Sequence, residues 1–419
     1  MKEIHTSQQD HPDTGQLKVS LTSAINGFPI EDATISISYT GVPENQLEQL
    51  TTDSSGQTET IDLPAPPLDY SLDVTNEIQP YAEYTIEASA PGYETISIAG
   101  AEILASVTAL QNIEMRPLSG VENNVFVIPA HTLYGTYPPK IPEDEIKPTN
   151  ETGEIVLSRV VVPEFIVVHD GSPRDSTARD YYVHYKDYIK NVASSEIYAT
   201  WPADTIRANV LAIMSFTLNR VYTEWYRNQG FDFTITSSTA FDHKWIPERN
   251  VYDTISTIVD ELFGNYLSRP NVRQPILTQY CDGRQVQCPN WMTQWGSMSL
   301  GERGYSPIEI LRYYYGDDMY INTAEAISGI PASWPGYDLE IGSTGDKVRQ
   351  MQEQLAVISG AYPAIPKITA DGIYGPATAE AVRKFQSVFG LPQTGVVDYP
   401  TWYKISEIYV GVSRIAELV

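Results

Sequence analysis

Apolar and polar residues alternate in short runs over the first quarter of the chain. Turn-forming clusters rich in Gly, Pro and Asp, such as residues 53–56 and 90–93, separate these runs. A period of two bounded by turn residues predicts β-strands with one buried face, and closely spaced short strands predict an antiparallel β-sandwich over residues 15–117. The alternating apolar positions are Leu17, Val19, Leu21, Ile35, Ile37, Tyr39, Tyr84, Ile86, Ala88, Ile96 and Ile98.

The spacing of apolar residues becomes helical in the middle of the chain. Ile189, Val192 and Glu196 stand three and four residues apart, so they share one face of a helix that we expect to be buried. Thr200 is expected to cap a second helix with Pro202 in its first turn. The polar residues expected to point away from the first helix's buried face are Lys190, Asn191 and Ser194.

The last quarter of the chain predicts a module of three short helices over residues 338–419. Val348, Met351, Leu355 and Ile358 form one apolar face, and a Gly-rich loop at 371–376 leads into the next helix. The sequence therefore predicts a multidomain protein, with an N-terminal antiparallel β-sandwich, a central α+β domain at 161–322 and a C-terminal three-helix module. The expected connections are a flexible N-terminus at 1–14, an extended linker or arm at 118–160 and a linker at 323–337.

Charge excludes some partners. The chain carries 53 Asp and Glu against 27 Lys and Arg, a formal net charge of −26, so we expect neither nucleic acid nor an anionic membrane as a partner. No apolar run is long enough for membrane insertion, and the N-terminus shows no secretion signal. Tyrosine is abundant, with 28 residues, and suits surfaces that are half apolar and half hydrogen-bonding, as sugar sites are.

Cys281 and Cys288 are the two cysteines, and six residues separate them. A disulfide that closes a hairpin, free thiols and a metal site all remain open from this spacing.

The candidate catalytic residue is Glu196. A carboxylate at the end of an apolar stripe is partly buried, and burial favours the protonated form that a general acid at a glycosidic oxygen needs. An ordinary amphipathic helix with an exposed Glu at its end has the same spacing.

Two separated motifs resemble the stage II sporulation protein D family, over roughly residues 160–322. The first runs from Asp187 to Glu196 with Trp201-Pro202 after it, and the second comprises Gln294-Trp295-Gly296-Ser297 and residues 304–316. Members of this family are lytic transglycosylases or non-catalytic amidase enhancers. The resemblance implies Glu196 as catalytic acid/base. The substrate-binding candidates in this region are Trp201, Arg207, Asn209, Gln294, Trp295, Tyr313 and Tyr314.

The chain departs from the family pattern at two places. Met214 stands where an Arg is common, and residues 236–243 lack the cysteines of members that bind zinc. We therefore expect no metal and no cofactor, with His243 as a surface or packing residue.

Residues 338–410 resemble the first peptidoglycan-binding domain family through Gly342-Ser343, Asp371-Gly372, Phe385-Gln386 and the Gly395 turn. Tyr374 and Phe385 are the candidate wall contacts. Residues 15–117 resemble the carboxypeptidase-regulatory-like fold, whose domains usually serve as spacers or adhesive modules, so a protein partner is an option there.

Together these resemblances imply a peptidoglycan lytic transglycosylase that cleaves glycan strands between N-acetylmuramic acid and N-acetylglucosamine and forms a 1,6-anhydro ring. The alternatives are a non-catalytic wall-binding scaffold or amidase enhancer, and a hydrolase that gives reducing-end products. The expected location is the cell wall, a spore envelope or a phage-type particle.

Overall fold

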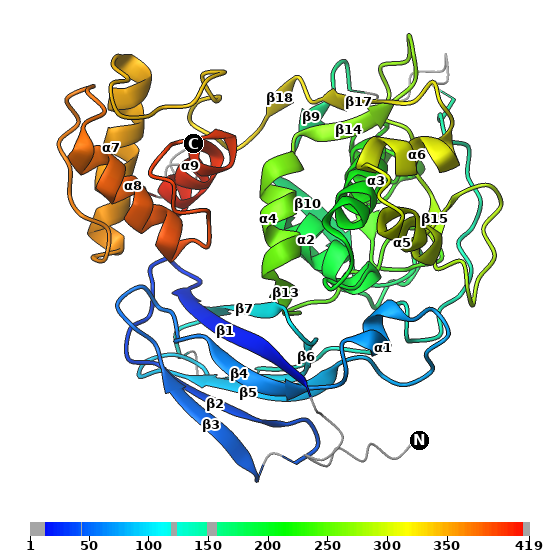
Figure 1. Ribbon diagram of the computed structural model, residues 1–419, viewed down its shortest axis with the longest axis horizontal. Coiled ribbons are helices and arrows are strands. Elements are labelled where there is room, and N and C mark those ends of the chain that lie inside the picture. Colours follow the sequence, from blue (N-terminus) through cyan, green and yellow to red (C-terminus); the bar gives the residue numbers. More distant parts are fainter. Residues whose placement is uncertain (1–12, 43, 119–123, 149–156, 414–419) are drawn as a thin grey trace.

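The computed structural model describes residues 13–42, 44–118, 124–148 and 157–413. Figure 1 shows an N-terminal pair of sheets, a central α+β region and a C-terminal helical module. The flexible N-terminus expected at 1–14 falls mostly outside the described residues. Residues 13 and 14 begin the first strand, which corrects that boundary.

The N-terminal part contains two sheets that pack against each other around one apolar core. Leu17, Val19 and Leu21 are fully buried on the inner face of β1, as the alternation predicts. The first sheet has the order β13-β7-β1-β4 and the second the order β3-β2-β5-β6-β8. The strands are β1 (Asp13–Ser23), β2 (Thr34–Tyr39), β3 (Gln46–Thr51), β4 (Ile61–Ala65), β5 (Ala82–Ser89), β6 (Ile96–Ile103), β7 (Thr108–Met115), β8 (Asn124–Val127) and β13 (Val251–Tyr252), with the short helix α1 (Asp69–Leu72).

The expectation of a purely antiparallel arrangement is wrong at two strand pairs. β1 pairs with β7 in parallel, and β6 pairs with β8 in parallel. Each pair joins strands that are distant in sequence, so the period-two pattern carried no information about their relative direction.

In the described part of the central region, the largely buried helices α2 (Tyr185–Glu196) and α3 (Ala203–Tyr222) are surrounded by three further helices, short strands and loops. The further helices of the region are α4 (Asp253–Leu262), α5 (Gln294–Glu302) and α6 (Pro307–Tyr315), with a 3₁₀ turn at Arg227–Gln229. Its strands are β9 (Val161–Val162), β10 (Phe165–His169), β11 (Asp180–His184), β12 (Ile235–Thr236), β14 (Asn265–Ser268), β15 (Tyr280–Cys281), β16 (Met292–Thr293), β17 (Tyr320–Thr323) and β18 (Ala326–Ile327).

From Tyr188 to Glu196, helix α2 is buried on every side, and this corrects the amphipathic interpretation of its sequence. Lys190, Asn191 and Ser194 are all buried, although they were expected to point away from the core. Lys190 pairs with Asp260 at 2.9 Å, and Asn191 donates to the backbone oxygen of Ile246 at 2.7 Å. Long-range partners satisfy these polar groups, so burial here does not follow the apolar spacing.

Thr200 does not cap helix α3. Its hydroxyl lies 2.8 Å from the Ser71 hydroxyl of the N-terminal part, and Pro202 occupies the N-cap position.

The described part of the expected linker begins with β8 of the second N-terminal sheet, which corrects the expectation for residues 124–127. Residues 128–148 form an arm that runs along the central region. The Thr132 hydroxyl donates to the Ser195 oxygen at 2.6 Å, and the Leu277 amide donates to the Glu145 oxygen at 2.9 Å. Glu143 accepts two hydrogen bonds from the guanidinium of buried Arg220. These bonds fix the arm against α3 and the β15 region.

The C-terminal module consists of α7 (Asp346–Ala361), α8 (Pro376–Val388) and α9 (Tyr399–Ser413). It docks on the central region through α9, where Tyr403 packs edge-on against the Phe263 ring. Lys186 of α2 forms ion pairs with Asp260 of α4 and with Glu407 of α9. Among the helices that the structure describes, none is long and apolar enough to cross a membrane.

The N-terminal sheets and the central region share a buried interface. Strand β13 of the central region extends the first N-terminal sheet beside β7. Arg249 forms a buried ion pair with Glu102 of β6, and the Asn250 amide group donates to the Glu102 oxygen at 3.0 Å. The β-sheet part is therefore integrated with the central region.

This interface makes stability depend on pH. Burial, reinforced by the Glu114 charge and opposed by Arg116, raises the pKa of Glu248 from 4.5 to about 7. The folded state thus holds this proton more tightly than the unfolded chain does, so the stabilisation is complete below pH 4.5 and is lost as pH rises through 7. Glu248→Gln should remove this loss, so that between pH 4.5 and pH 8 the variant gains about 3 kcal/mol of unfolding free energy relative to wild type. Urea unfolding of both proteins at the two pH values measures it, and identical pH dependence would contradict it.

Candidate functional site

Glu196 is the last residue of helix α2, and its side chain is only 2% exposed. One carboxylate oxygen accepts the Lys244 backbone N–H at 2.8 Å, and the other accepts the Gln294 side-chain N–H at 3.1 Å. Gln294 also donates to the Glu196 backbone oxygen at 3.0 Å. Among the described residues no Lys, Arg or His lies within salt-bridge distance of this carboxylate. Neutral donors therefore hold a buried carboxylate in a fixed orientation.

Glu196 lines a small pocket with a cavity volume of about 40 Å³, which is enough for a few water molecules. The arm contributes Thr132, Tyr137 and Lys140 to its wall, and the other side is the loop that follows β15. The pocket thus lies where the arm, the end of α2 and the β15 loop meet.

Lys140 and Tyr280 line the same pocket as the carboxylate. Burial lowers the pKa of the Lys140 ammonium, while the nearby Glu196 and Asp242 charges raise it. The ammonium lies 4.8 Å from the centre of the Tyr280 ring. Burial, followed by the Glu196 charge, raises the pKa of Tyr280 well above its ordinary value, and a side-chain hydrogen bond with Glu196 acts in the same direction.

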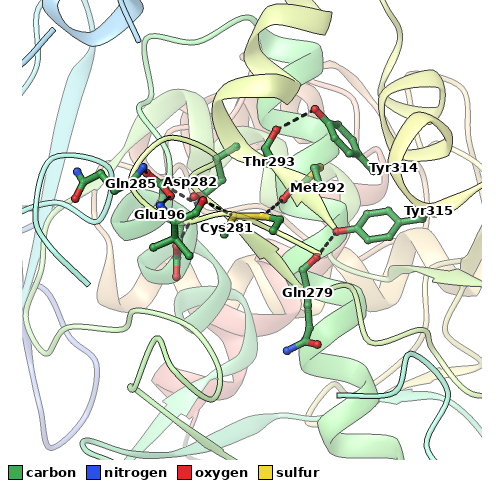
Figure 2. Close-up of a disulfide and its surroundings, with 12 residues drawn as sticks. Glu196, Gln279, Cys281, Asp282, Gln285, Met292, Thr293, Tyr314 and Tyr315 are labelled. Atoms are coloured by element: carbon green, nitrogen blue, oxygen red, sulfur yellow. Dashed lines mark hydrogen bonds between the residues drawn. A yellow bond between two sulfur atoms is a disulfide. The ribbon is translucent and has the colours of Figure 1, made fainter. Parts of the chain in front are cut away.

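A disulfide joins Cys281 and Cys288. The loop that it closes forms one wall of the pocket through Asp282, Gln285 and Val286. Figure 2 shows Glu196 beside Asp282 and Gln285, on one side of the disulfide. Both carboxylate oxygens of Asp282 are used inside the loop, where they accept the Gln285 and Val286 amides at 2.6 and 2.8 Å.

Reducing this disulfide should lower stability, because the closed loop restricts the unfolded chain. For a sequence separation of 7 residues the expected loss is about 2.5 kcal/mol. Urea unfolding with and without dithiothreitol measures the change. Cys281→Ser/Cys288→Ser serves as the control, because dithiothreitol should leave its stability unchanged. Equal stability of the oxidised and reduced wild-type protein would contradict the expectation.

The other predicted site residues of the central region separate into two groups. Gln294 lies against Glu196 and lines the pocket. Trp201 and Trp295 are buried side by side with ring centres 5.1 Å apart, and Asn209 is buried with its amide group bonded to Ser297. Arg207 is partly exposed and pairs with Glu261 at 2.8 Å. Gln294 and Glu196 thus line the pocket together. The side chains outside its wall are Trp201, Trp295, Asn209 and Arg207.

Tyr313 and Tyr314 also lie outside the pocket wall. Tyr313 is 66% exposed on α6, and the Tyr314 hydroxyl lies 3.1 Å from that of Thr293. Figure 2 places Tyr314 on the far side of the disulfide from Glu196.

Tyr374 and Phe385 are core residues of the helical module, which corrects their expected role as wall contacts. Phe385 is fully buried, and the Tyr374 hydroxyl donates to the Gly395 oxygen at 2.9 Å. The neighbouring Ile373 is 57% exposed, so a ligand can reach this side chain, whereas it cannot reach the buried Tyr374 and Phe385.

The sequence interpretation missed Lys140, Tyr280 and Lys244 as parts of the site. Lys140 stands in a Pro-rich stretch with no periodic pattern, and Lys244 contributes only its backbone amide to Glu196. His243 is buried, in agreement with a packing role, and its ring contacts the Tyr280 hydroxyl at 2.7 Å. Over the described residues, no group of three or more His, Cys, Asp or Glu is placed to hold a metal ion.

Comparison with known proteins gives matches to parts of the chain. The chain is 39% identical over 77 residues to the zinc D-Ala-D-Ala carboxypeptidase of Streptomyces albus G, which covers 18% of this chain and 28% of that protein. It is 47% identical over 51 residues to the N-acetylmuramoyl-L-alanine amidase CwlA of Bacillus subtilis strain 168, covering 12% and 18%. The chain thus spans less than a third of either curated relative.

A solved structure, the N-terminal domain of SleB, aligns with 18% of this chain and 99% of its own, at 26% identity and a TM-score of 0.16. The family model of a peptidoglycan binding domain matches residues 344–405. This range begins just before α7 and ends within α9, so it covers the helical module. Residues 344–405 therefore form a domain of the peptidoglycan binding family.

Proposed function

We propose that the protein is a peptidoglycan lytic transglycosylase. Glu196 is the acid/base, and the helical module anchors the chain to the wall. The observation that carries the proposal is the Glu196 carboxylate itself, which is buried, held by neutral donors and open to a pocket. The resemblance of the surrounding motifs to the stage II sporulation protein D family supports the same role.

The chemistry needs one carboxylic acid. Glu196 donates its proton to the glycosidic oxygen as the bond to the muramic anomeric carbon breaks. The resulting carboxylate then accepts the proton of the muramic C6 hydroxyl as that oxygen bonds to the anomeric carbon. The 1,6-anhydro ring closes, the N-acetylglucosamine end leaves as an alcohol, and Glu196 regains its proton.

The second carboxylate of the pocket supports this reading over hydrolysis. An ordinary glycosidase uses a second carboxylate as nucleophile or as base for water. Asp282 is the other acidic residue among the described residues of the pocket wall, and both of its oxygens hold the disulfide loop. An internal nucleophile on the sugar removes the need for a second free carboxylate.

The relatives support a wall-bound location. Both curated relatives are named as enzymes that act on cell-wall peptides or on the bond between muramic acid and its peptide, and residues 344–405 match a peptidoglycan binding family. We therefore propose that the protein is located at the cell wall, in a spore envelope or in a phage-type particle. The β-sheet part packs against the central region, and we propose that it also binds a protein partner.

The rival function is a non-catalytic scaffold or amidase enhancer with the same wall module. Incubation of the full chain with purified sacculi separates the two. The pellet reports binding, and muropeptide-containing fragments in the supernatant report cleavage. Binding with release of fragments supports the enzyme, whereas binding without release over a day supports the scaffold.

A further inference from the structure

Tyr280 and His243 form a buried pair next to the proposed catalytic carboxylate. Tyr280 lies in β15 and is 2% exposed, and His243 is fully buried. The Tyr280 hydroxyl is 2.7 Å from the His243 Nδ1 atom, and the two rings stack with centres 5.7 Å apart. Both Tyr280 and Glu196 line the same pocket.

We propose that Tyr280 is a positioning residue for Glu196, with its hydroxyl donating to the carboxylate and His243 fixing the direction of that hydroxyl. This inference rests on the proposed function, because it assigns the pair a role in the same site. His243 matters because a phenol O–H has two orientations in the plane of the ring, and a hydrogen-bond partner on the oxygen selects one of them.

The tautomer of His243 follows from its surroundings. Burial lowers the pKa of His243 well below its ordinary value, and the nearby Lys140 and Arg220 charges lower it further. The ring is therefore neutral and carries one N–H. Its Nε2 atom is buried and has no partner among the described residues. A buried N–H without an acceptor costs more than a bare lone pair, so the hydrogen belongs on Nδ1.

This assignment sets the direction of the whole chain of hydrogen bonds. His243 Nδ1–H donates to the Tyr280 oxygen, which leaves the Tyr280 hydrogen to point at the Glu196 carboxylate. When Glu196 has given up its proton to the leaving sugar, the carboxylate keeps the Lys244 and Gln294 donors. In the proposed arrangement, Tyr280 of the same pocket wall supplies a third donor. The Tyr280 donor comes from the pocket wall and stabilises the charged form that appears during the reaction.

The test is Tyr280→Phe in the full chain, which removes the donor and keeps the ring. We expect kcat for glycan-strand cleavage to fall about 10- to 100-fold with KM nearly unchanged. Tyr315→Phe is the matched control. Its hydroxyl donates to the Gln279 oxygen at 2.9 Å on the other side of the disulfide, so kcat should stay within about two-fold. A Tyr280→Phe enzyme with wild-type kcat overturns the proposal.

A pair of His243 variants tests the orienting role. His243→Asn keeps an amide N–H near the position of Nδ1, whereas His243→Leu removes the donor. His243→Asn should retain more activity than His243→Leu, with thermal melts of both variants reporting any loss of fold. Equal activity of two equally stable variants would refute the orienting role.

Nitrogen-15 NMR of labelled histidine gives a readout that does not need cleavage. His243 should appear as the neutral Nδ1–H tautomer in the wild-type protein, and its Nδ1 shift should change in Tyr280→Phe. An Nε2–H tautomer refutes the chain of hydrogen bonds. If wild type and Glu196→Gln both fail to cleave glycan, the proposed function fails, and the tautomer still decides the hydrogen-bond assignment.

Discussion

Glu196→Gln should lower the rate of glycan-strand cleavage by about 10²- to 10⁴-fold, which is the range for loss of a general acid/base. The amide that replaces the carboxylate can still accept the Lys244 N–H, but it cannot deliver a proton to a glycosidic oxygen. Wall binding should not change, because the helical module at 344–405 lies outside the pocket.

The measurement is the rate of release of soluble fragments from purified glycan strands by equal amounts of folded protein. Glu302→Gln is the matched control, since it removes the same charge from an exposed position on α5. Wild-type cleavage by Glu196→Gln would remove Glu196 from the mechanism.

Arg220→Met should cost about 3–5 kcal/mol of unfolding free energy, which is the usual cost of leaving a buried ion pair without its partner. The Arg220 side chain is completely buried. Its guanidinium donates to both carboxylate oxygens of Glu143, at 2.9 and 2.6 Å, and to Asp242 at 2.7 Å. Without the cation, two carboxylates remain in the interior and must either stay charged or take up protons.

The same variant should make the arm at the pocket wall more mobile, because Arg220 holds Glu143 and the same arm carries Lys140. Urea unfolding gives the change in stability, and hydrogen exchange of residues 128–148 gives the change in mobility. Arg207→Met is the control, because Arg207 pairs with Glu261 at a partly exposed site and its loss should cost at most about 1 kcal/mol. Similar losses for both variants would contradict the burial argument.

Local patterns predicted those parts of the fold that depend on local sequence. The alternation at Leu17, Val19 and Leu21 identified a strand with one buried face, and the structure places all three in the core. The spacing after Gly345 identified a helix, and α7 begins at Asp346. In both cases the residues that determine the element lie within a few positions of one another.

The pocket could be predicted only at Glu196 and Gln294, where two motifs pointed to a site. Lys140 and Tyr280 reach it from segments 56 residues before and 84 residues after Glu196. Tertiary packing alone brings these segments together, and no spacing in the sequence reports it. Tyr374 and Phe385 failed as contact candidates for a related reason, because the positions that define a domain family are often those that form its core.

The central claim is that Glu196 drives cleavage through an internal attack on the sugar. Mass spectrometry of the products from purified glycan strands, with the reaction run in water enriched in oxygen-18, tests it most directly. The account predicts muramic ends in the 1,6-anhydro form, without the heavy isotope, from wild type and none from Glu196→Gln. Reducing ends that carry oxygen-18 would show that water is the nucleophile and would contradict the account.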